Sequence, residues 1–439
     1  MQHYGKSEVL QMLLSYKFSN FRSFSEESIL SMKPANVRDI PYSILRERAD
    51  KEYRALSSSI IYGANASGKS NAILVLSFLK ELVITGNIKN QRCIPTGLIP
   101  CFCNKGDAPI SFAIEFLNKG YHIDYSLKIG GASFLNDADS EPYVEYEKLI
   151  VNSKEIFERK DKEITLFSWN EKVDDDTQSM LRDKAESSLL RDELFLSNGF
   201  KTLGDTNLYS IILNCFNNKL IVVRNVDYIS TMPKFDYEHI EDANEDGCKI
   251  SDDIINKIAK EAGINYSEIH FIQDDKDKKP KQISVIDGKG VIARFIESSG
   301  TMKIVNFLPL VISIMAKGGT LVVDELDSSL HPSAVFSIIN AFHNDELNIQ
   351  KAQLIFTSHN PIYQKAKIFR RDEIKFIERN ECSSRLYSLS DFGTSGESSV
   401  KNSTDIMKNY LTGKYGAVNY VDFSDVIREA ILLNKCKEE

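Results

Sequence analysis

The order of apolar and polar residues separates this chain into strand-like and helix-like stretches. In residues 110–130 and 143–160, apolar and polar positions alternate with a period of two, and residues 12–35 alternate in a similar way. This period is typical of strands with one buried face. The three stretches therefore predict an antiparallel β lobe.

Three shorter runs, 57–63, 320–323 and 354–357, consist almost wholly of apolar or small residues. Runs of this length between polar residues indicate strands that are buried on both faces. Residues 71–83 and 295–318 instead have the longer apolar spacing of helices. The chain is thus predicted to have an α/β fold.

A segment of different composition lies between these parts. Residues 171–200 have helical spacing and many charges, and no seven-residue repeat persists, which excludes long coiled-coil arms. We expect an N-terminal lobe at 12–165, a mainly helical insertion at 166–280, a C-terminal lobe at 281–380 and a tail at 381–439.

Composition and charge limit the classes of partner. The chain has 439 residues, 42% of them hydrophobic, and its net charge of −8 disfavours a protein that binds nucleic acid over its whole surface. Residues 274–282 contain four lysines, which fit either a solvated hairpin tip or a local contact with nucleic acid. Nucleic acid therefore stays open as a partner.

The sequence lacks the usual features of secreted and membrane proteins. No uninterrupted apolar run approaches the roughly 20 residues of a membrane span, and the first eleven residues carry no apolar signal sequence. The seven cysteines are irregularly spaced, and no second Cys/His pair completes a zinc site with Cys101 and Cys103. We expect plain thiols and a cytoplasmic protein without a membrane partner.

A phosphate-binding motif of the form G-x-x-x-x-G-K-S follows the first buried strand and precedes the first helix. The motif requires this context, because the backbone N–H groups of the loop then surround the phosphates. Lys69 would reach the β and γ phosphates, and the Ser70 hydroxyl would bind Mg²⁺. A chance glycine-rich turn is the alternative. The expected nucleotide-binding residues are Gly63, Asn65, Gly68, Lys69, Ser70 and Asn71.

Two adjacent carboxylates, Asp324 and Glu325, follow the apolar run at 320–323. Alone, they would be explained as solvated acids at the end of a strand. Beside a phosphate loop they predict that Asp324 and Ser70 hold Mg²⁺ and that Glu325 orients or deprotonates the attacking water. ATP and Mg²⁺ are the expected cofactors.

The order of these motifs resembles that of the ABC-class ATPases, and the segments DELDSSLHP and FTSHNP are similar to those of the SMC, RecF and OLD branch. With FSNFRSF near the start and NYLTGKYGAV near the end, the chain resembles compact bacterial ATPases of the AAA_21 and AAA15 types. These include AbiLi-type abortive-infection proteins and the AriA ATPase of PARIS anti-phage defence. The resemblance covers most of the chain outside residues 170–280. It implies an ABC-type ATPase head, a P-loop fold with a mixed sheet and an antiparallel β lobe.

In ABC-class ATPases two heads meet head to tail and enclose two ATP molecules, so the resemblance implies a homodimer and leaves larger oligomers open. Ser298, Ser299 and Gly300 would form the signature segment, which contacts the γ phosphate bound by Lys69 of the partner subunit. Thr301 stands where the family has a second glycine. An ordinary helix cap at Ser299 is the alternative.

Other roles also follow from the resemblance. Asp327 would be the D-loop acid that crosses the dimer interface, and His359 would be the switch histidine that contacts the γ phosphate; a polar strand end is the alternative for His359. Arg22 is expected to face either the nucleotide or solvent. The glutamine-bearing loop is not assigned, and Gln91 is a candidate.

The residues predict ATP binding and slow hydrolysis. The resemblance implies a sensor or scaffold subunit of an abortive-infection system that controls a separate toxic effector, for which a nuclease is expected. The alternatives are a DNA-maintenance ATPase of the RecF type that clamps DNA, and a structural subunit that keeps ATP bound.

Overall fold

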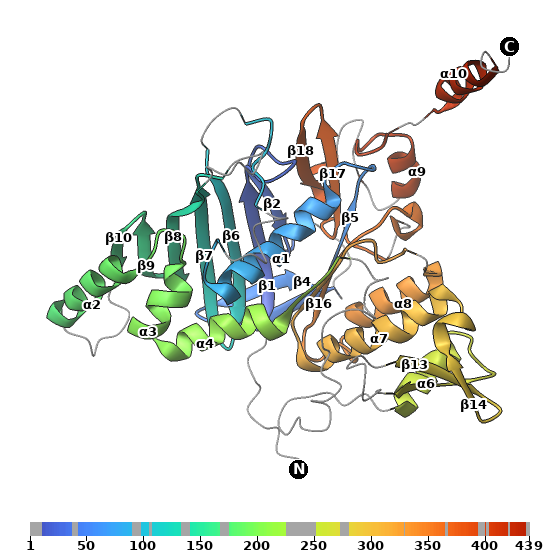
Figure 1. Ribbon diagram of the computed structural model, residues 1–439, viewed down its shortest axis with the longest axis horizontal. Helices are drawn as coiled ribbons and strands as arrows, with labels where there is room; N and C mark the ends of the chain where they lie inside the picture. Colours follow the sequence, from blue (N-terminus) through green and yellow to red (C-terminus); the bar gives the residue numbers. More distant parts are fainter. Residues whose placement is uncertain are drawn as a thin grey trace.

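Two large β-sheets form the framework of the structure (Figure 1). The structure, a computed structural model, describes residues 11–36, 43–89, 98–104, 108–132, 141–166, 175–224, 252–272, 281–328, 330–364, 368–393, 400, 404–419 and 422–435.

The larger sheet is antiparallel and has seven strands in the order β10-β9-β8-β7-β6-β1-β2. Buried and more exposed positions alternate along much of β6 and β7, as expected for strands with one face in a core. The predicted β lobe is confirmed. Its strands are β1 (Met12–Ser19), β2 (Ser28–Ser31), β6 (Ile110–Asn118), β7 (Tyr121–Gly130), β8 (Tyr143–Val151), β9 (Lys154–Lys160) and β10 (Glu163–Leu166).

The second sheet is mixed and has six strands in the order β11-β15-β16-β5-β17-β18. The first five are parallel, and β18 is antiparallel to β17. The strands are β5 (Ser58–Tyr62), β11 (Leu220–Val223), β15 (Thr320–Val323), β16 (Gln353–Thr357), β17 (Ile374–Asn380) and β18 (Ser383–Ser388). A separate pair is formed by β3 (Ile44–Arg48) and β4 (Glu52–Leu56).

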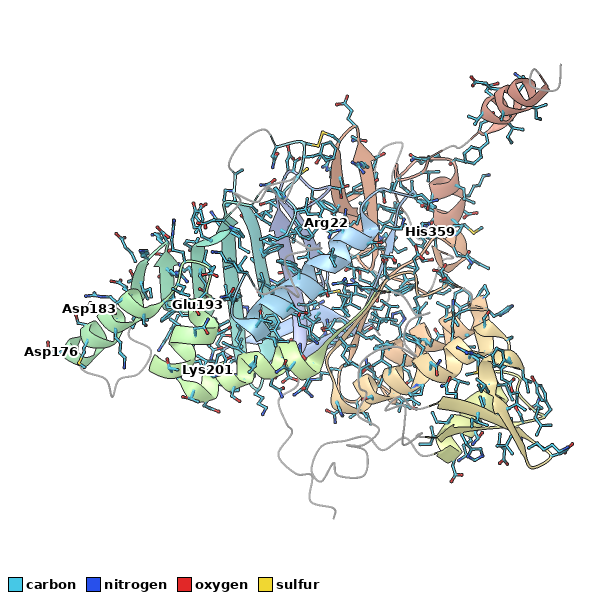
Figure 2. All side chains as sticks on the ribbon, in the orientation of Figure 1. Arg22, Asp176, Asp183, Glu193, Lys201 and His359 are labelled. Carbon is cyan, nitrogen blue, oxygen red and sulfur yellow. A yellow bond between two sulfur atoms is a disulfide. The ribbon has the colours of Figure 1, made fainter. Side chains whose placement is uncertain are left out.

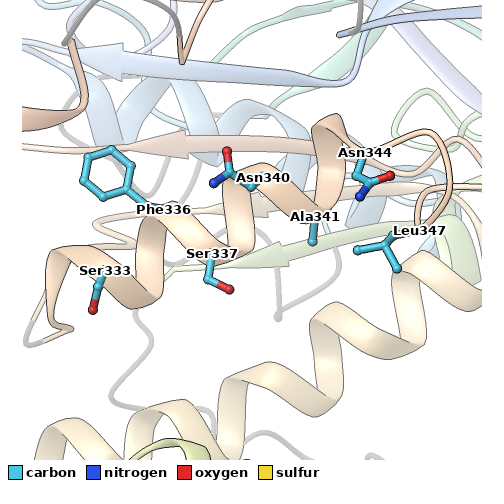
Figure 3. Close-up of a pocket in the computed structure, with 7 residues that line it drawn as sticks. All are labelled: Ser333, Phe336, Ser337, Asn340, Ala341, Asn344 and Leu347. Carbon is cyan, nitrogen blue, oxygen red and sulfur yellow. The ribbon is translucent and has the colours of Figure 1, made fainter.

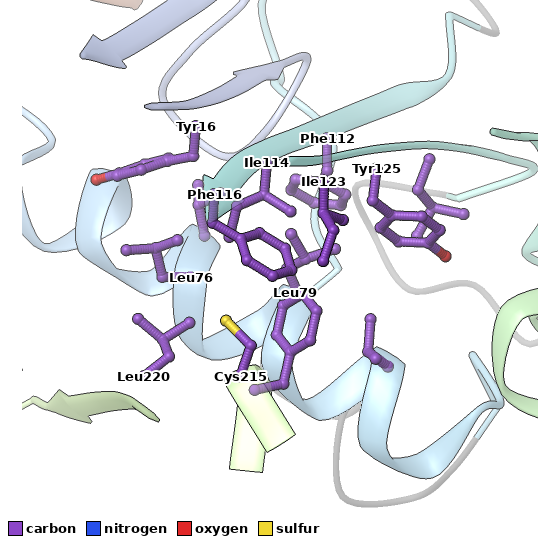
Figure 4. Packing of buried hydrophobic residues seen from close by; sticks show 14 of the residues in the cluster. Tyr16, Leu76, Leu79, Phe112, Ile114, Phe116, Ile123, Tyr125, Cys215 and Leu220 are labelled. Atoms are coloured by element: carbon purple, nitrogen blue, oxygen red, sulfur yellow. The ribbon is translucent and has the colours of Figure 1, made fainter. Parts of the chain in front are cut away.

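Both faces of the mixed sheet are covered, which explains its nearly continuous apolar strands. One face joins the core around α1 (Lys69–Thr85), where Leu76 and Leu79 belong to the same cluster as Phe112 and Phe116 of the antiparallel sheet (Figure 4). The other face packs with α7 (Ser299–Lys317) and α8 (Pro332–His343).

A small subdomain packs against α7 through a third apolar cluster. It contains α6 (Asp252–Glu261), β12 (Glu268–Ile272), β13 (Lys281–Ile286) and β14 (Lys289–Ile292). The β13–β14 hairpin turns at Asp287 and Gly288, and both residues have positive φ, as a tight two-residue hairpin turn requires.

The segment 166–280, predicted as a mainly helical insertion, supplies helices but also strands of the sheets. Its strand β11 lies at the edge of the mixed sheet, and β12 pairs with β13 across the predicted boundary. The sequence of such a short strand does not reveal which other strand it pairs with. The helices are α2 (Asp175–Ser188), α3 (Lys201–Leu203), α4 (Thr206–Asn214) and α6.

The C-terminal part contains two further helices, α9 (Ile406–Leu411) and α10 (Ser424–Lys435). The side chains of α9 pack in the core on the α7 side of the mixed sheet. Figure 1 shows α10 projecting away from the rest of the chain.

Cys103 and Cys382 form a disulfide although 279 residues separate them, with their Cα atoms 6.0 Å apart. The prediction of plain thiols is therefore wrong for this pair, because spacing along the chain does not reveal that two distant loops meet. Cys101 and Cys215 are buried free thiols, whereas Cys93, Cys248 and Cys436 lie outside the described residues.

Among the described residues, α7 is the one helix that is long and apolar enough to cross a membrane by length and composition. A core helix of a soluble protein meets the same criterion. Phe307, Leu310 and Ile314 of α7 belong to the apolar core beside the mixed sheet.

Candidate nucleotide site

The loops that follow β5, β16 and β15 meet at one edge of the mixed sheet. These three strands are parallel neighbours, so their carboxyl ends lie together, where α/β sheets bind their ligands. The phosphate loop, residues 63–70, follows β5; the acids follow β15; and the switch residues follow β16. The tertiary structure thus unites motifs that are far apart in sequence.

The two glycines of the phosphate loop are required by close contacts. A Cβ on Gly63 would lie 2.4 Å from the carbonyl oxygen of Ile377. Gly68 has a φ of +110°, and a Cβ there would lie 2.7 Å from the Oγ atoms of Ser23 and Ser384. The backbone therefore makes its tight turn only with glycine at these positions.

Lys69 begins α1 and folds back over the loop. Its Nζ donates hydrogen bonds to the carbonyl oxygens of Gly63 (2.7 Å) and Ala64 (2.9 Å). Burial lowers the pKa of Lys69 to about 8, although the acids after β15 act in the opposite direction. The phosphate loop thus holds an ammonium group whose charge is costly without an anion.

Two of the remaining predicted residues lie on the open side of the phosphate loop. Asn65 and Ser70 are exposed, which suits groups that contact a nucleotide or its cation. Asn71 donates from Nδ2 to Ser23 Oγ (2.9 Å). Ser384 donates from Oγ to the carbonyl oxygen of Ser67 (2.6 Å). Hydroxyls from the first strand's turn and from β18 therefore support the loop from behind.

The two acids after β15 are held by one hydroxyl. Thr357 Oγ1 donates to Asp324 Oδ1 (2.6 Å) and accepts from the backbone N–H of Glu325 (2.7 Å). Asp324 is buried, whereas Glu325 has a positive φ of 51° and a half-exposed side chain. The positive φ turns the chain sharply, so that one carboxylate is fixed and its neighbour faces outward.

The two residues after Thr357 are Ser358, which contacts Asp327, and His359, the predicted switch histidine. Ser358 Oγ donates to Asp327 Oδ2 (2.8 Å). His359, which is labelled in Figure 2, has its Nε2 atom 3.6 Å from Glu325 Oε1, and both side chains remain half-exposed. Consecutive residues Thr357, Ser358 and His359 thus contact all three acids that were predicted to act in the site.

Residues 298–300, which are predicted to form the signature segment, lie at the start of α7. The cap is Ser298 rather than Ser299: its Oγ accepts from the backbone N–H of Thr301 (3.1 Å). The preceding Glu297 is buried and accepts hydrogen bonds of 2.8 Å from the hydroxyls of Tyr266, Ser267 and Ser284. The small subdomain therefore fixes the start of this helix.

Lys303 links the signature helix to the acidic loop. It lies one turn into α7, is buried, and donates from Nζ to the carbonyl oxygen of Ser328 (3.2 Å). Ser328 comes directly after Asp327. A displacement of α7 would therefore act on the loop that carries the predicted D-loop acid.

Ser70 and Asp324 provide the oxygen donors expected for Mg²⁺. The described residues contain no group of three or more His, Cys, Asp or Glu side chains that could hold a metal ion. Mg²⁺ in nucleotide sites usually takes one or two carboxylates together with phosphate oxygens and water, so a hydroxyl and one buried carboxylate fit this ion.

Arg22 and Gln91 were left open by the sequence. Arg22 has a φ of 53°, and its backbone N–H donates to the carbonyl oxygen of Ile99 (2.8 Å). Burial and, to a smaller extent, the charge of Arg224 lower the pKa of the Arg22 side chain. It is therefore half-buried beside another cation rather than a free surface charge. Gln91 lies outside the described residues.

Four supporting hydroxyls were not predicted. Thr357 and Ser358 stand directly before the switch histidine, and their position could have indicated a role. Ser23 and Ser384 come from segments remote from the phosphate loop. No local pattern distinguishes them from surface serines, so only the tertiary structure identifies them.

Two of the cavities in the described part of the chain bear on the position of the site. A shallow one of about 530 Å³ follows α8 and is lined by none of the predicted site residues (Figure 3). A second, of about 290 Å³, adjoins the phosphate loop and is lined by residues 64–67, 377–381 and 417–419. The second cavity extends the predicted site.

Comparison with solved structures gives three SMC heads among the matches. An Smc head bound to the C-terminal winged-helix domain of ScpA has 11% identity and a TM-score of 0.43, covering 86% of this chain and 97% of that one. An SMC head from Thermotoga maritima has 13% identity and a TM-score of 0.37, covering 86% and 98%. An Smc head with an extended coiled coil, bound to the C-terminal domain of ScpA from Pyrococcus furiosus, has 9% identity and a TM-score of 0.42, covering 87% and 97%.

Comparison with curated proteins gives no match. Residues 58–362 match the AAA_21 family, described as "AAA domain, putative AbiEii toxin, Type IV TA system". The fold is α/β, with a mixed sheet and an antiparallel β lobe around the phosphate loop. Because the family match covers well over half of the chain, this protein belongs to the AAA_21 family of ATPases.

Proposed function

We propose that this chain binds and hydrolyses ATP as a head-to-tail homodimer, and that the nucleotide state of the dimer controls a separate effector in an abortive-infection defence system. The observation that carries the ATPase proposal is the cluster of Asp324, Glu325 and Asp327 held by the switch strand beside Lys69. The family description, which names a putative toxin of a type IV toxin–antitoxin system, supports the defence role.

Each residue in the site has a separate task in this proposal. The backbone of the phosphate loop and Lys69 bind the phosphates, and Asp324 and Ser70 hold Mg²⁺. Bound Mg²⁺ neutralises charge on the β and γ phosphates. Glu325 orients the attacking water or accepts its proton, and His359, close to Glu325, contacts the γ phosphate.

The dimer supplies the residues that one chain lacks at its own phosphate loop. Ser298, Ser299 and Gly300 begin a long helix, where free N–H groups and the helix dipole favour an anion. In the proposed dimer this anion is the γ phosphate bound by the second copy. Asp327 lies in the loop that approaches the same interface.

The substitution Glu325→Gln tests the ATPase and the dimer together. It removes the base but keeps the side chain's size, so hydrolysis should fall about 100-fold or more while ATP binding persists. Light scattering after size exclusion should then show an ATP-dependent dimer. Lys69→Ala is the control that should lose both nucleotide binding and dimerisation. A Glu325→Gln protein that stays monomeric with ATP and hydrolyses it at the wild-type rate would contradict the proposal.

The effector is tested by affinity capture with the Glu325→Gln protein from nuclease-treated lysate of its own host. A stoichiometric protein partner that is absent from the Lys69→Ala capture would support effector control, and nuclease assays on that partner would test its activity. Recovery of protected DNA fragments without a protein partner would instead favour the DNA clamp.

A further inference from the structure

An exposed apolar patch lies directly before the signature segment. Phe295 is 70% exposed, and Val291, Ile292 and Ile296 are 37–40% exposed. Ala293 is fully buried within the small subdomain. Phe295 is therefore placed outside the core although its neighbours anchor it firmly, and exposed apolar patches of this kind mark interaction sites.

Arg294 accompanies Phe295 on this patch. Its guanidinium carbon lies 5.0 Å from the centre of the Phe295 ring, within the range of a cation–π contact. Two residues later, Glu297 is buried and held by three hydroxyls. Arg294 and Phe295 thus form a cationic and aromatic pair, and the nearby Glu297 is held in place by its hydrogen bonds.

The cavity beside the phosphate loop has complementary properties. Val418 contributes half-exposed apolar surface, whereas Ile377 and Ala417 are almost wholly buried, and Glu378 and Glu381 contribute negative charge. Arg379 also lines the cavity, but its guanidinium group already has contacts. Its Nη1 donates to the carbonyl oxygen of Ala66 (3.4 Å), and the group lies over the Phe102 ring.

The proposed dimer brings patch and cavity together. If Ser298 contacts the phosphate bound by a second copy, Phe295 lies only three residues away, which is about 10 Å at full extension. The wall of the cavity includes residues 64–67 of the phosphate loop itself. The segment before the signature must therefore lie close to the cavity of the second copy.

We propose that Phe295 and Arg294 of one copy dock in the cavity formed by residues 64–67, 377–381 and 417–419 of a second copy, with Phe295 against Val418 and Arg294 facing Glu381. This inference rests on the head-to-tail dimer proposed above. The two-fold symmetry of a dimer makes the contact twice. It would let each copy detect, through its own phosphate loop, that the other is in place.

The test uses the Glu325→Gln background, in which ATP should accumulate the dimer, and measures the dimerisation constant with ATP by sedimentation. Phe295→Ala and Arg294→Glu should each weaken dimerisation by about tenfold or more, as expected for a buried anchor residue. ATP binding to the monomer should not change. Phe423→Ala, at another exposed phenylalanine, is the matched control and should have no effect.

A double variant that exchanges the charges of Arg294 and Glu381 provides the decisive test. Arg294→Glu combined with Glu381→Lys should recover most of the dimerisation that Arg294→Glu loses. If the Glu325→Gln parent dimerises but Phe295→Ala and Arg294→Glu dimerise equally well, the docking contact is wrong and the dimer stands. A parent that stays monomeric with ATP bound overturns the dimer and the docking contact together.

Discussion

At the scale of single residues, the end of β16 organises the acidic side of the site. Thr357 fixes Asp324 and the backbone of Glu325, Ser358 fixes Asp327, and His359 lies beside Glu325. If His359 contacts the γ phosphate as proposed, these three adjacent side chains would transmit the loss of that phosphate to every acid in the site.

Replacing Thr357 by Val should slow hydrolysis while leaving ATP binding nearly unchanged. The variant removes the hydrogen bond that Thr357 donates to the buried Asp324 carboxylate, which costs roughly 1–3 kcal/mol; felt fully in the transition state, this corresponds to a loss of about 5- to 150-fold in kcat. Steady-state phosphate release and titration with a fluorescent ATP analogue separate the two effects. Thr357→Ser keeps the hydroxyl and should retain most of the activity; equal losses in both variants would contradict the assigned role.

The lowered pKa of Lys69 predicts that ATP affinity depends on pH. The Lys69 ammonium, with a pKa of about 8, is charged below that pH and becomes a neutral amine above it. Because the phosphates bind the charged form, affinity should fall by up to about tenfold per pH unit above pH 8. Calorimetric titration between about pH 7 and 9.5 measures it.

The matched control for this pH dependence is Lys69→Arg. A guanidinium stays charged throughout this range, so any affinity that the variant retains should vary little with pH. If both proteins lost affinity with the same slope, another group would be responsible.

At the scale of elements, α7 joins the two functions assigned to the C-terminal lobe. Its first turn carries the signature segment, and Lys303, one turn further, contacts the acidic loop through Ser328. Glu297 ties the same helix start to Ser267, directly before β12, and to Ser284 of β13. In the proposed ATPase, a partner that moves the small subdomain would therefore also move the start of α7.

At the scale of the whole molecule, the disulfide connects the loop at Cys103 with the β17–β18 turn. Ser384, two residues beyond Cys382, donates to the phosphate loop at Ser67. The cross-link therefore secures the hairpin that supports the loop from behind.

Peptide mapping without reductant should recover Cys103 and Cys382 in one linked peptide. Because the cross-link closes a very long loop of the unfolded chain, its removal by Cys103→Ser should lower the free energy of unfolding, by at most about 5 kcal/mol. A thermal melt with and without reductant measures the effect. Cys101→Ser should preserve the link, and alkylation of Cys103 in the unreduced native protein would show that the bond is absent.

The local patterns of the sequence determined much of this protein. The period-two strands, the buried strands and the helix after the phosphate loop are all found where the sequence placed them. These features depend on side-chain periodicity and on φ preferences, which act over a few residues. The phosphate loop was recognisable for the same reason, since its glycines and Lys69 are adjacent in sequence.

The tertiary structure alone decided which remote groups meet. The pairing of β11 with β15, the hydroxyls of Ser23 and Ser384 behind the phosphate loop, and the disulfide between Cys103 and Cys382 all join segments far apart in the chain. Such contacts leave no periodic signal, because each depends on the packing of two whole sheets. The site is therefore specified by local motifs but assembled by the fold.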